Sequence, residues 1–140
     1  MKTEKFDTFT SSMRKISYKG ITTTLRGKSQ TAKLAGAIVR SRLAACVQFW
    51  PIQSTYWWKS RVQTGSEFIL VCKTRALRVT ALQRFIKSHH PYKVPEIVVT
   101  PIETGFPPYL AWISKETSEP PLTFTASPTR KRSSRSDGKS

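Results

Sequence analysis

The chain has 140 residues, of which 38% are hydrophobic and 11% aromatic, and its 24 lysines and arginines outnumber 8 acidic residues, giving a net charge of +16. A chain of this length buries one ordinary core, which excludes two full-sized domains. Its apolar runs are far shorter than the roughly 20 residues that span a membrane, and its first residues lack the apolar centre of a secretory signal. We therefore expect one small cytoplasmic domain without a membrane partner.

The two ends of the chain differ in composition from its centre. Residues 1–14 and 118–140 are rich in small polar and basic residues and hold few large apolar side chains, so we expect both to be disordered. The folded domain is predicted over residues 15–117. The C-terminal segment contains RKRSSR, and a strongly basic chain favours polyanion contact. This tail is therefore either a solvated segment or a contact for nucleic acid or another polyanion.

The first predicted elements are a strand and a helix. Residues 15–24, KISYKGITTT, are rich in strand-favouring Thr and Ile, although Gly20 and the lysines interrupt the pattern. Residues 29–42 place apolar side chains at helical spacing. A strand over 15–24 would thus lead directly into a helix.

The centre of the chain is predicted to form strands. Residues 44–50 are a short apolar run, residues 52–58 alternate loosely, and Pro51 between them is expected to separate two strands. Residues 67–74, EFILVCKT, form a nearly continuous apolar run, which is typical of a strand in the interior of a sheet.

A second helix and a last strand complete the pattern. Thr74 is expected to cap a helix over 75–89, which has one apolar stripe. Residues 95–103 predict a final strand, and residues 108–113 form a short apolar closing segment. With the two runs around Pro51 counted as one arm of the sheet, the order β-α-β-β-α-β predicts an α+β fold of the ferredoxin-like, split β-α-β type, with an antiparallel sheet and both helices on one of its faces.

The segment KSHHPYKVPEI contains both histidines of the chain, His89 and His90, followed by Glu96. Imidazole and carboxylate groups are ligands of divalent copper and zinc, so these three residues are candidate metal ligands. Adjacent side chains do not converge as residues four apart on a helix do, and Pro91 favours an extended His90. The structural alternative is that His89 ends the helix as a favourable cation and His90 packs beside Tyr92.

Other side chains are candidates for a cleft or a subunit interface. The aromatic run STYWW, residues 54–58, suits a pocket, a core or an interface. The polar candidates suit a cleft or salt bridges between subunits. Cys46 and Cys72 lie in apolar runs and are interpreted as buried, reduced thiols rather than nucleophiles or a disulfide. The cleft and interface candidates are Tyr56, Trp57, Trp58, Glu67, Lys73, Tyr92 and Trp112.

Two runs of the sequence, RLAACVQFWPIQSTYWWKSRVQTGSEFILVCKT and SHHPYKVPEIVVTPIETGFPPYLAWI, resemble the CutA divalent-cation tolerance family. The resemblance is dense from Ala35 to Ile113. It implies a ferredoxin-like subunit in a homotrimer joined by sheet edges, with divalent copper as the ion and no catalysis. The start of the chain departs from the family, because GITTT has threonine where relatives can have cysteine and LRGKSQ is basic where acids are usual. A soft thiolate ligand is therefore absent there.

Three functional hypotheses follow. The first is a trimeric, non-catalytic protein that binds a divalent cation and serves metal tolerance. The second is a nucleic-acid- or anion-binding module that acts through the basic tail, although EFILVCKT lacks the basic-glycine-aromatic pattern with which RNA-recognition sheets stack bases. The third is a small thiol enzyme or hydrolase, for which the residues give little support.

Overall fold

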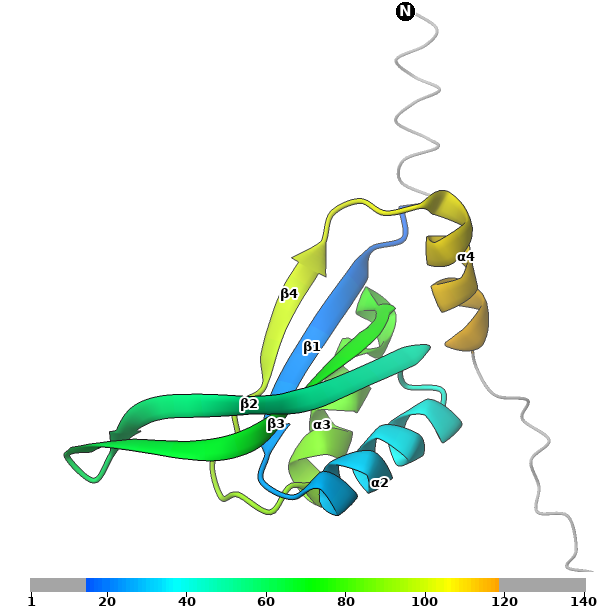
Figure 1. The fold of residues 1–140 in the computed structure, drawn as a ribbon. Helices are drawn as coiled ribbons and strands as arrows, with labels where there is room; N and C mark the ends of the chain where they lie inside the picture. The colour runs from blue at the N-terminus through cyan, green and yellow to red at the C-terminus, as the bar shows by residue number, and fades with distance from the viewer. Residues whose placement is uncertain (1–14, 119–140) are drawn as a thin grey trace, which may run out of the picture.

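The structure is a computed structural model that describes residues 15–118. The expected disorder of residues 1–14 and 118–140 lies outside the described residues, except at Ser118, and so does the expected anion contact through RKRSSR. Figure 1 shows the arrangement of the elements. In chain order they are β1 (Tyr18–Leu25), α2 (Lys28–Arg40), β2 (Cys46–Trp58), β3 (Arg61–Arg75), the 3₁₀ helix η1 (Ala76–Arg78), α3 (Val79–His89), β4 (Val98–Ile102) and α4 (Pro107–Glu116).

The four strands form one antiparallel sheet in the order β2-β3-β1-β4. Helices α2 and α3 cover one face of this sheet (Figure 1). The predicted α+β class, the split β-α-β order and the strand near residues 15–24 are confirmed. β1 forms although Gly20 and the lysines interrupt its strand pattern, because it is paired on both sides and buries Ile21 and Leu25 against the helices. At Gly20 an added Cβ would lie 3.3 Å from Thr100 Oγ1, so a small residue suits the close approach of β4.

The core lies between the sheet and the two helices. Alternate residues of β1 and β3 point to the helical face, where Ile21 and Leu70 are fully buried. The apolar stripes of the helices supply the opposite side, which confirms the helical spacing seen in the sequence. The buried cluster consists of Ile21, Leu25, Leu34, Ala35, Ile38, Ala44, Leu70, Cys72, Leu82 and Ile86.

The prediction of two strands separated by Pro51 is wrong. β2 continues without interruption through Pro51, which is opposite Phe68 of β3. Within residues 15–118, β2 is an edge strand of the sheet and is paired on one side only. An edge strand tolerates a proline, because a missing N–H need not remove a bond of the ladder.

The prediction that Thr74 caps the second helix is also wrong. Thr74 is a buried residue of β3, and its hydroxyl donates a hydrogen bond to the carbonyl of Leu43 at 2.7 Å. The pairing of β3 with β1 continues to Arg75, so α3 begins only at Val79 after the 3₁₀ turn. The strand ladder therefore extends past the polar residue that suggested a helix start.

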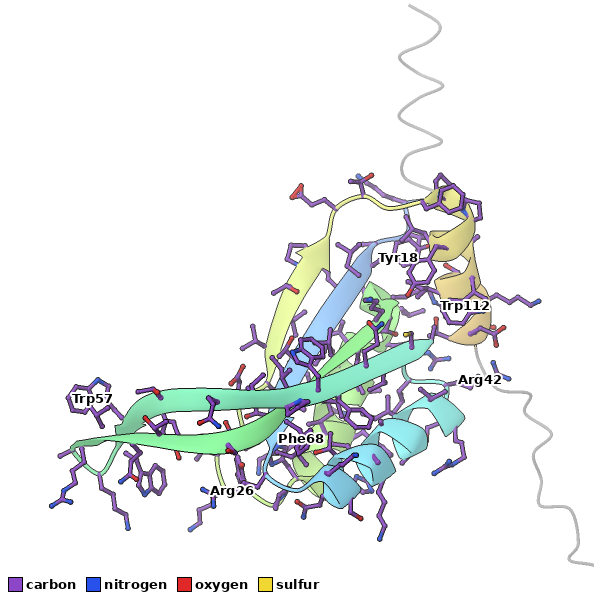
Figure 2. All side chains as sticks on the ribbon, in the orientation of Figure 1. Tyr18, Arg26, Arg42, Trp57, Phe68 and Trp112 are labelled. Carbon is purple, nitrogen blue, oxygen red and sulfur yellow. The ribbon has the colours of Figure 1, made fainter. Side chains whose placement is uncertain are left out.

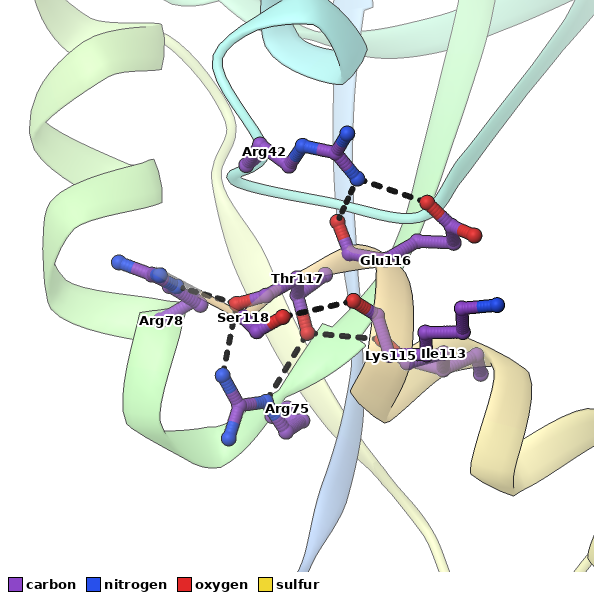
Figure 3. A network of polar contacts seen from close by, with 8 residues as sticks. All are labelled: Arg42, Arg75, Arg78, Ile113, Lys115, Glu116, Thr117 and Ser118. Atoms are coloured by element: carbon purple, nitrogen blue, oxygen red, sulfur yellow. Dashed lines mark hydrogen bonds and ion pairs between the residues drawn. The ribbon is translucent and has the colours of Figure 1, made fainter. Parts of the chain in front are cut away.

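The closing apolar segment forms helix α4, which begins with a proline in its first turn, a position that needs no N–H donor. At its other end the buried Thr117 accepts a hydrogen bond at its carbonyl from Arg75 Nη2 at 2.6 Å and from Arg78 Nε at 2.8 Å (Figure 3). Arg75 Nε also donates to Thr117 Oγ1 at 2.9 Å. These bonds tie the end of α4 to the end of β3.

None of the helices in residues 15–118 is long and apolar enough to cross a membrane.

Candidate functional site

His90 lies where the chain leaves α3 and turns towards the end of β1. Its backbone is extended, at φ −91° and ψ 136°, as expected for a residue before a proline. The ring nitrogen Nε2 lies 2.9 Å from the carbonyl oxygen of Thr24 and 3.1 Å from Thr23 Oγ1. The backbone N–H of Tyr92 donates to Nδ1 at 3.1 Å. Both ring nitrogens of His90 are thus engaged within the chain.

These contacts assign the tautomer of His90. A backbone N–H only donates, so Nδ1 is the acceptor, and a carbonyl only accepts, so Nε2 carries the hydrogen. Burial lowers the pKa of His90, while the bond to Thr24 and the nearby Glu67 carboxylate oppose that shift and Lys87 adds to it. His90 is therefore a neutral imidazole at neutral pH.

Tyr92 connects His90 to the sheet. Its ring packs edge-on against that of His90, with 4.8 Å between centroids. Its hydroxyl donates to Glu67 Oε2 of β3 at 2.7 Å. Burial raises the pKa of Tyr92 to about 12, with the Glu67 carboxylate acting in the same direction and Arg26 in the opposite one. The cluster thus holds a protonated phenol against a carboxylate, an arrangement that fixes the loop after α3.

His89 engages different partners. Its Nδ1 lies 2.9 Å from the carbonyl oxygen of Phe85, and its ring stacks on that of Phe85 with 4.1 Å between centroids. Because a carbonyl accepts, Nδ1 carries the hydrogen and Nε2 of the neutral ring keeps a lone pair. His89 is exposed at the end of α3, so this lone pair is accessible to a ligand from solution.

The three candidate metal ligands differ in whether their donor atoms are available to an ion. His90 does not fit, because a metal at either nitrogen would displace a hydrogen bond to Thr24 or Tyr92. His89 offers one nitrogen, and Glu96 is an exposed carboxylate before β4. Among residues 15–118 no three His, Cys, Asp or Glu side chains are gathered so that they could hold a metal ion.

The aromatic candidates of β2 lie on the hairpin that β2 and β3 form beyond the rest of the sheet. Trp57 is at the far end of this hairpin (Figure 2), and 73% of its surface is exposed. Tyr56 and Trp58 are also exposed. Lys73 lies further along β3, where its Nζ donates to Gln48 Oε1 at 2.8 Å. These residues are not brought near His90, whereas Glu67 and Tyr92 are.

Trp112 lies on α4, away from both groups, with its ring stacked on that of Tyr109 at 5.5 Å between centroids. It lines a surface hollow of about 520 Å³ between α4 and the C-terminal end of α2. Figure 2 shows Trp112 and Arg42 on the same side of the molecule. The lining residues are Val39, Arg40, Arg42, Ala44, Ala45, Trp112 and Glu116.

The two cysteines are free thiols. Cys46 is opposite Lys73 and Cys72 is opposite Val47, so the two thiols point to opposite faces of the sheet. Burial raises the pKa of Cys72 to about 12, which disfavours the nucleophilic thiolate.

Some residues of the site carry little signal in the sequence. Phe85 precedes His89 by four residues, a spacing that predicts contact between two side chains on a helix. Thr24 and Arg26, in contrast, reach the loop after α3 only through the fold.

Comparison with known proteins gives a consistent result. The sequence profile of the CutA1 divalent ion tolerance protein family matches residues 20–116. The chloroplastic protein CutA 1 of rice, Oryza sativa, is 42% identical over 97 residues, which cover 69% of this chain and 55% of the rice protein. The human protein CutA is 40% identical over 97 residues, covering 69% of this chain and 54% of the human protein. The chain thus spans about half the length of these relatives.

Solved structures match over a similar region. The structure of CutA1 from Oryza sativa has a TM-score of 0.72 at 39% identity, with 75% of this chain and 97% of that chain covered. CutA from Synechococcus elongatus has a TM-score of 0.71 at 32% identity, covering 73% and 91%. The periplasmic divalent cation tolerance protein CutA from Archaeoglobus fulgidus has a TM-score of 0.70 at 30% identity, covering 71% and 98%.

Proposed function

Because the chain belongs to the CutA1 divalent ion tolerance protein family, whose members are non-catalytic, we propose that it binds a divalent cation as a homotrimer and serves tolerance of such ions. The observation that carries this proposal is the family match over residues 20–116. The high pKa of Cys72 supports the same function over a thiol enzyme, since that thiol is held protonated.

We propose copper as the ion and His89 as a ligand. Imidazole suits divalent copper, which binds nitrogen donors more tightly than the other divalent ions of the first transition row. The lone pair on His89 Nε2 and the exposed Glu96 carboxylate support this choice. The remaining ligands would come from another copy of the chain. His90, Tyr92 and Glu67 are proposed to shape the adjoining loop rather than to bind the ion, because their polar atoms bond to one another and to Thr24.

The homotrimer is proposed to form through the sheet. β2 is an open edge of 13 residues, and a long exposed edge strand favours pairing with another chain. The hairpin beyond it exposes Trp57, Trp58 and Val62, which a partner would bury. The interface candidates Tyr56 and Lys73 lie on the same hairpin strands.

We propose a cytoplasmic location on the basis of the free thiols Cys46 and Cys72, since a reducing compartment preserves such thiols. Relatives differ in compartment: the rice protein is named chloroplastic, and the Archaeoglobus fulgidus structure is titled periplasmic. Fractionation of the source cells with an antibody to the chain would test this assignment.

The experiment combines light scattering behind a sizing column with copper titration by calorimetry. Wild type is expected to elute at three times the 15.9 kDa chain mass and to bind copper. His89→Gln is expected to remain trimeric and to bind copper at least about tenfold more weakly, because it loses a ligand nitrogen. His90→Gln serves as the matched control and is expected to retain affinity.

Four outcomes would contradict parts of this proposal. A monomeric mass by light scattering would contradict the proposed trimer. Unchanged copper affinity in His89→Gln would remove His89 from the site, and an equal loss in His90→Gln would mean that His90 exchanges a hydrogen bond for the metal. Absence of heat with copper, zinc and nickel alike would remove cation binding.

A further inference from the structure

The acidic residues of the domain are unevenly distributed over its elements. Residues 15–118 contain 16 lysines and arginines and four glutamates. Each glutamate lies in β3, in α4 or in the loops on either side of β4, and neither α2 nor α3 contains an acidic residue. The two helices cover the same face of the sheet (Figure 1). The helical face therefore carries an unbalanced positive charge, which attracts polyanions.

The outer side of α2 presents a basic row. Lys33 and Arg40 are exposed and lie opposite the buried stripe that includes Leu34 and Ile38. The Arg40 guanidinium folds back along the helix, because its Nη1 lies 3.0 Å from where a Cβ on Gly36 would be. Both cations therefore lie on the solvent-facing side of α2, and the Arg40 guanidinium lies over Gly36.

The basic row leads to the hollow beside α4. Arg40 and Trp112 both line this hollow, and the small side chains of Ala44 and Ala45 are also in its wall. The Trp112 side chain retains 39% of its exposure. Arg42 at the rim is paired with Glu116 at 2.7 Å, so Arg40 is the more available cation. A cationic row that ends at an accessible indole is the combination used by proteins that bind single strands.

We propose that α2 and this hollow form a binding site for single-stranded nucleic acid, in which Lys33 and Arg40 contact phosphates and Trp112 stacks on a base. Phosphate contacts of this kind supply affinity without reading sequence. Aromatic stacking is equally tolerant, since every base has a π face. The site is separate from His89 and from the hairpin aromatics.

The same observations favour a nucleic acid over an anionic membrane. A helix that lies on a membrane buries a broad apolar face in the lipid. In α2 the apolar face is used by the core, and the exposed large apolar side chain in that helix is Val39 alone. A single strand is favoured over a duplex because only unpaired bases are free to stack on a protein ring.

The test measures fluorescence anisotropy of a labelled twelve-residue oligothymidylate with the full chain at several salt concentrations. Lys33→Gln/Arg40→Gln is expected to lower the slope of log affinity against log salt by about 0.7 for each phosphate that the variant no longer neutralises. Trp112→Leu keeps an apolar side chain but has no π face, and it is expected to weaken binding by about fivefold or more. Circular dichroism verifies that each variant is folded, and Trp112→Phe, which keeps a ring, is expected to bind better than Trp112→Leu.

Two charge-matched controls locate the site. Lys59→Gln/Arg61→Gln removes two charges from the hairpin, and Arg130→Gln/Arg132→Gln removes two from the C-terminal segment. Both are expected to alter affinity less than Lys33→Gln/Arg40→Gln. An equal or larger effect of either control would overturn the proposal, as would unchanged binding in Trp112→Leu, equal affinity for duplex, or binding to phosphatidylserine vesicles without binding to the oligonucleotide.

Discussion

The hydroxyl of Tyr92 and the carboxylate of Glu67 meet at 2.7 Å, across 25 residues of sequence, and this contact joins the loop after α3 to β3. A hydrogen bond to a charged group stabilises more than one between neutral groups. The bond is therefore a specific support for the loop that carries His90, and it is the basis of the first prediction.

Tyr92→Phe is expected to lower the free energy of unfolding by about 1–2 kcal/mol, because it removes a charge-assisted hydrogen bond and leaves a partly buried carboxylate less solvated. Urea denaturation at fixed protein concentration measures the change. Glu67→Gln keeps an acceptor for the phenol and should cost less. If the two single variants and the double variant show additive effects, the two groups do not interact energetically.

His90 is expected to make stability depend on pH. Its pKa is lowered in the folded chain from the ordinary value of 6.5, so below that value the unfolded chain binds more protons. The contribution of neutral His90 is thus fully present above about pH 6.5 and is lost as the pH falls towards the lowered pKa. Unfolding free energies at pH 5.5 and 7.5 measure this effect.

His90→Gln should flatten that pH profile, since glutamine does not titrate. His89→Gln is the control, because it replaces the other histidine and leaves His90 and its bonds to Thr24 and Tyr92 in place. The ionisable side chains that act on His90 are Glu67, which favours its protonated form, and Lys87, which disfavours it. An NMR titration in which His90 protonates at or above pH 6.5 would contradict the argument.

At position 42, arginine is expected to give a lower free energy of unfolding than glycine would. Helix α2 ends with the N–H of Leu43 bonded to the carbonyl of Ile38 and that of Arg42 bonded to Val39, a Schellman arrangement in which glycine is preferred. Arg42 has φ 62° there, which costs a non-glycine residue about 1–2 kcal/mol. Its exposed ion pair with Glu116 contributes about 0–1 kcal/mol.

Arg42→Gly should therefore raise the free energy of unfolding by up to about 1 kcal/mol, the backbone gain being larger than the contribution of the ion pair. Glu116→Gln is the matched control, because it removes the ion pair and leaves the backbone unchanged. A variant Arg42→Gly that is less stable than Glu116→Gln would show that the side chain of Arg42 holds α4 more strongly than its backbone strains α2.

The turn between β2 and β3 offers a second site for a glycine. Trp58 pairs with Arg61, so Lys59 and Ser60 form a two-residue loop, with φ of 50° and 61°. Such loops favour Asn-Gly. Ser60→Gly is expected to raise the thermal unfolding midpoint, with a stabilisation of about 0.5–1 kcal/mol.

Ser54→Gly is the control for Ser60→Gly in the same hairpin. Ser54 lies within β2, outside the left-handed region, so glycine there should destabilise by about 0.5–1 kcal/mol. Two substitutions of the same type are thus expected to act with opposite sign. A decrease in both would mean that the turn tolerates its serine without strain.

The sequence predicted those elements whose apolar side chains are periodic. α2 and α3 each have a buried stripe, and the apolar run in β3 lies inside the sheet. The predictions at Pro51 and Thr74 were wrong because strand pairing outweighs their local preferences. Pro51, expected to end a strand, lies within the edge strand β2. Thr74, expected to cap a helix, lies in β3 and bonds to Leu43 instead.

The site was less predictable than the fold. His90 and Tyr92 share a segment with a recognisable motif, but Thr24 lies 66 residues from His90 and Glu67 lies 25 residues from Tyr92. Only the antiparallel arrangement of β1 and β3 brings those partners together. No spacing rule relates residues that meet in this way, so a short motif identified the loop and not its contacts.

The unequal lengths of the strands have a consequence for local opening. β1 pairs with β3 only from Phe68 to Arg75, so the β2–β3 segment from Ile52 to Glu67 is a two-stranded ribbon. Such a ribbon is marginally stable by itself. In an isolated chain the amide hydrogens of this ribbon should exchange with solvent through local opening. Those of Leu70 and Cys72 should exchange only when the whole sheet unfolds. Slow exchange in the ribbon would thus report, residue by residue, the surface that another copy covers.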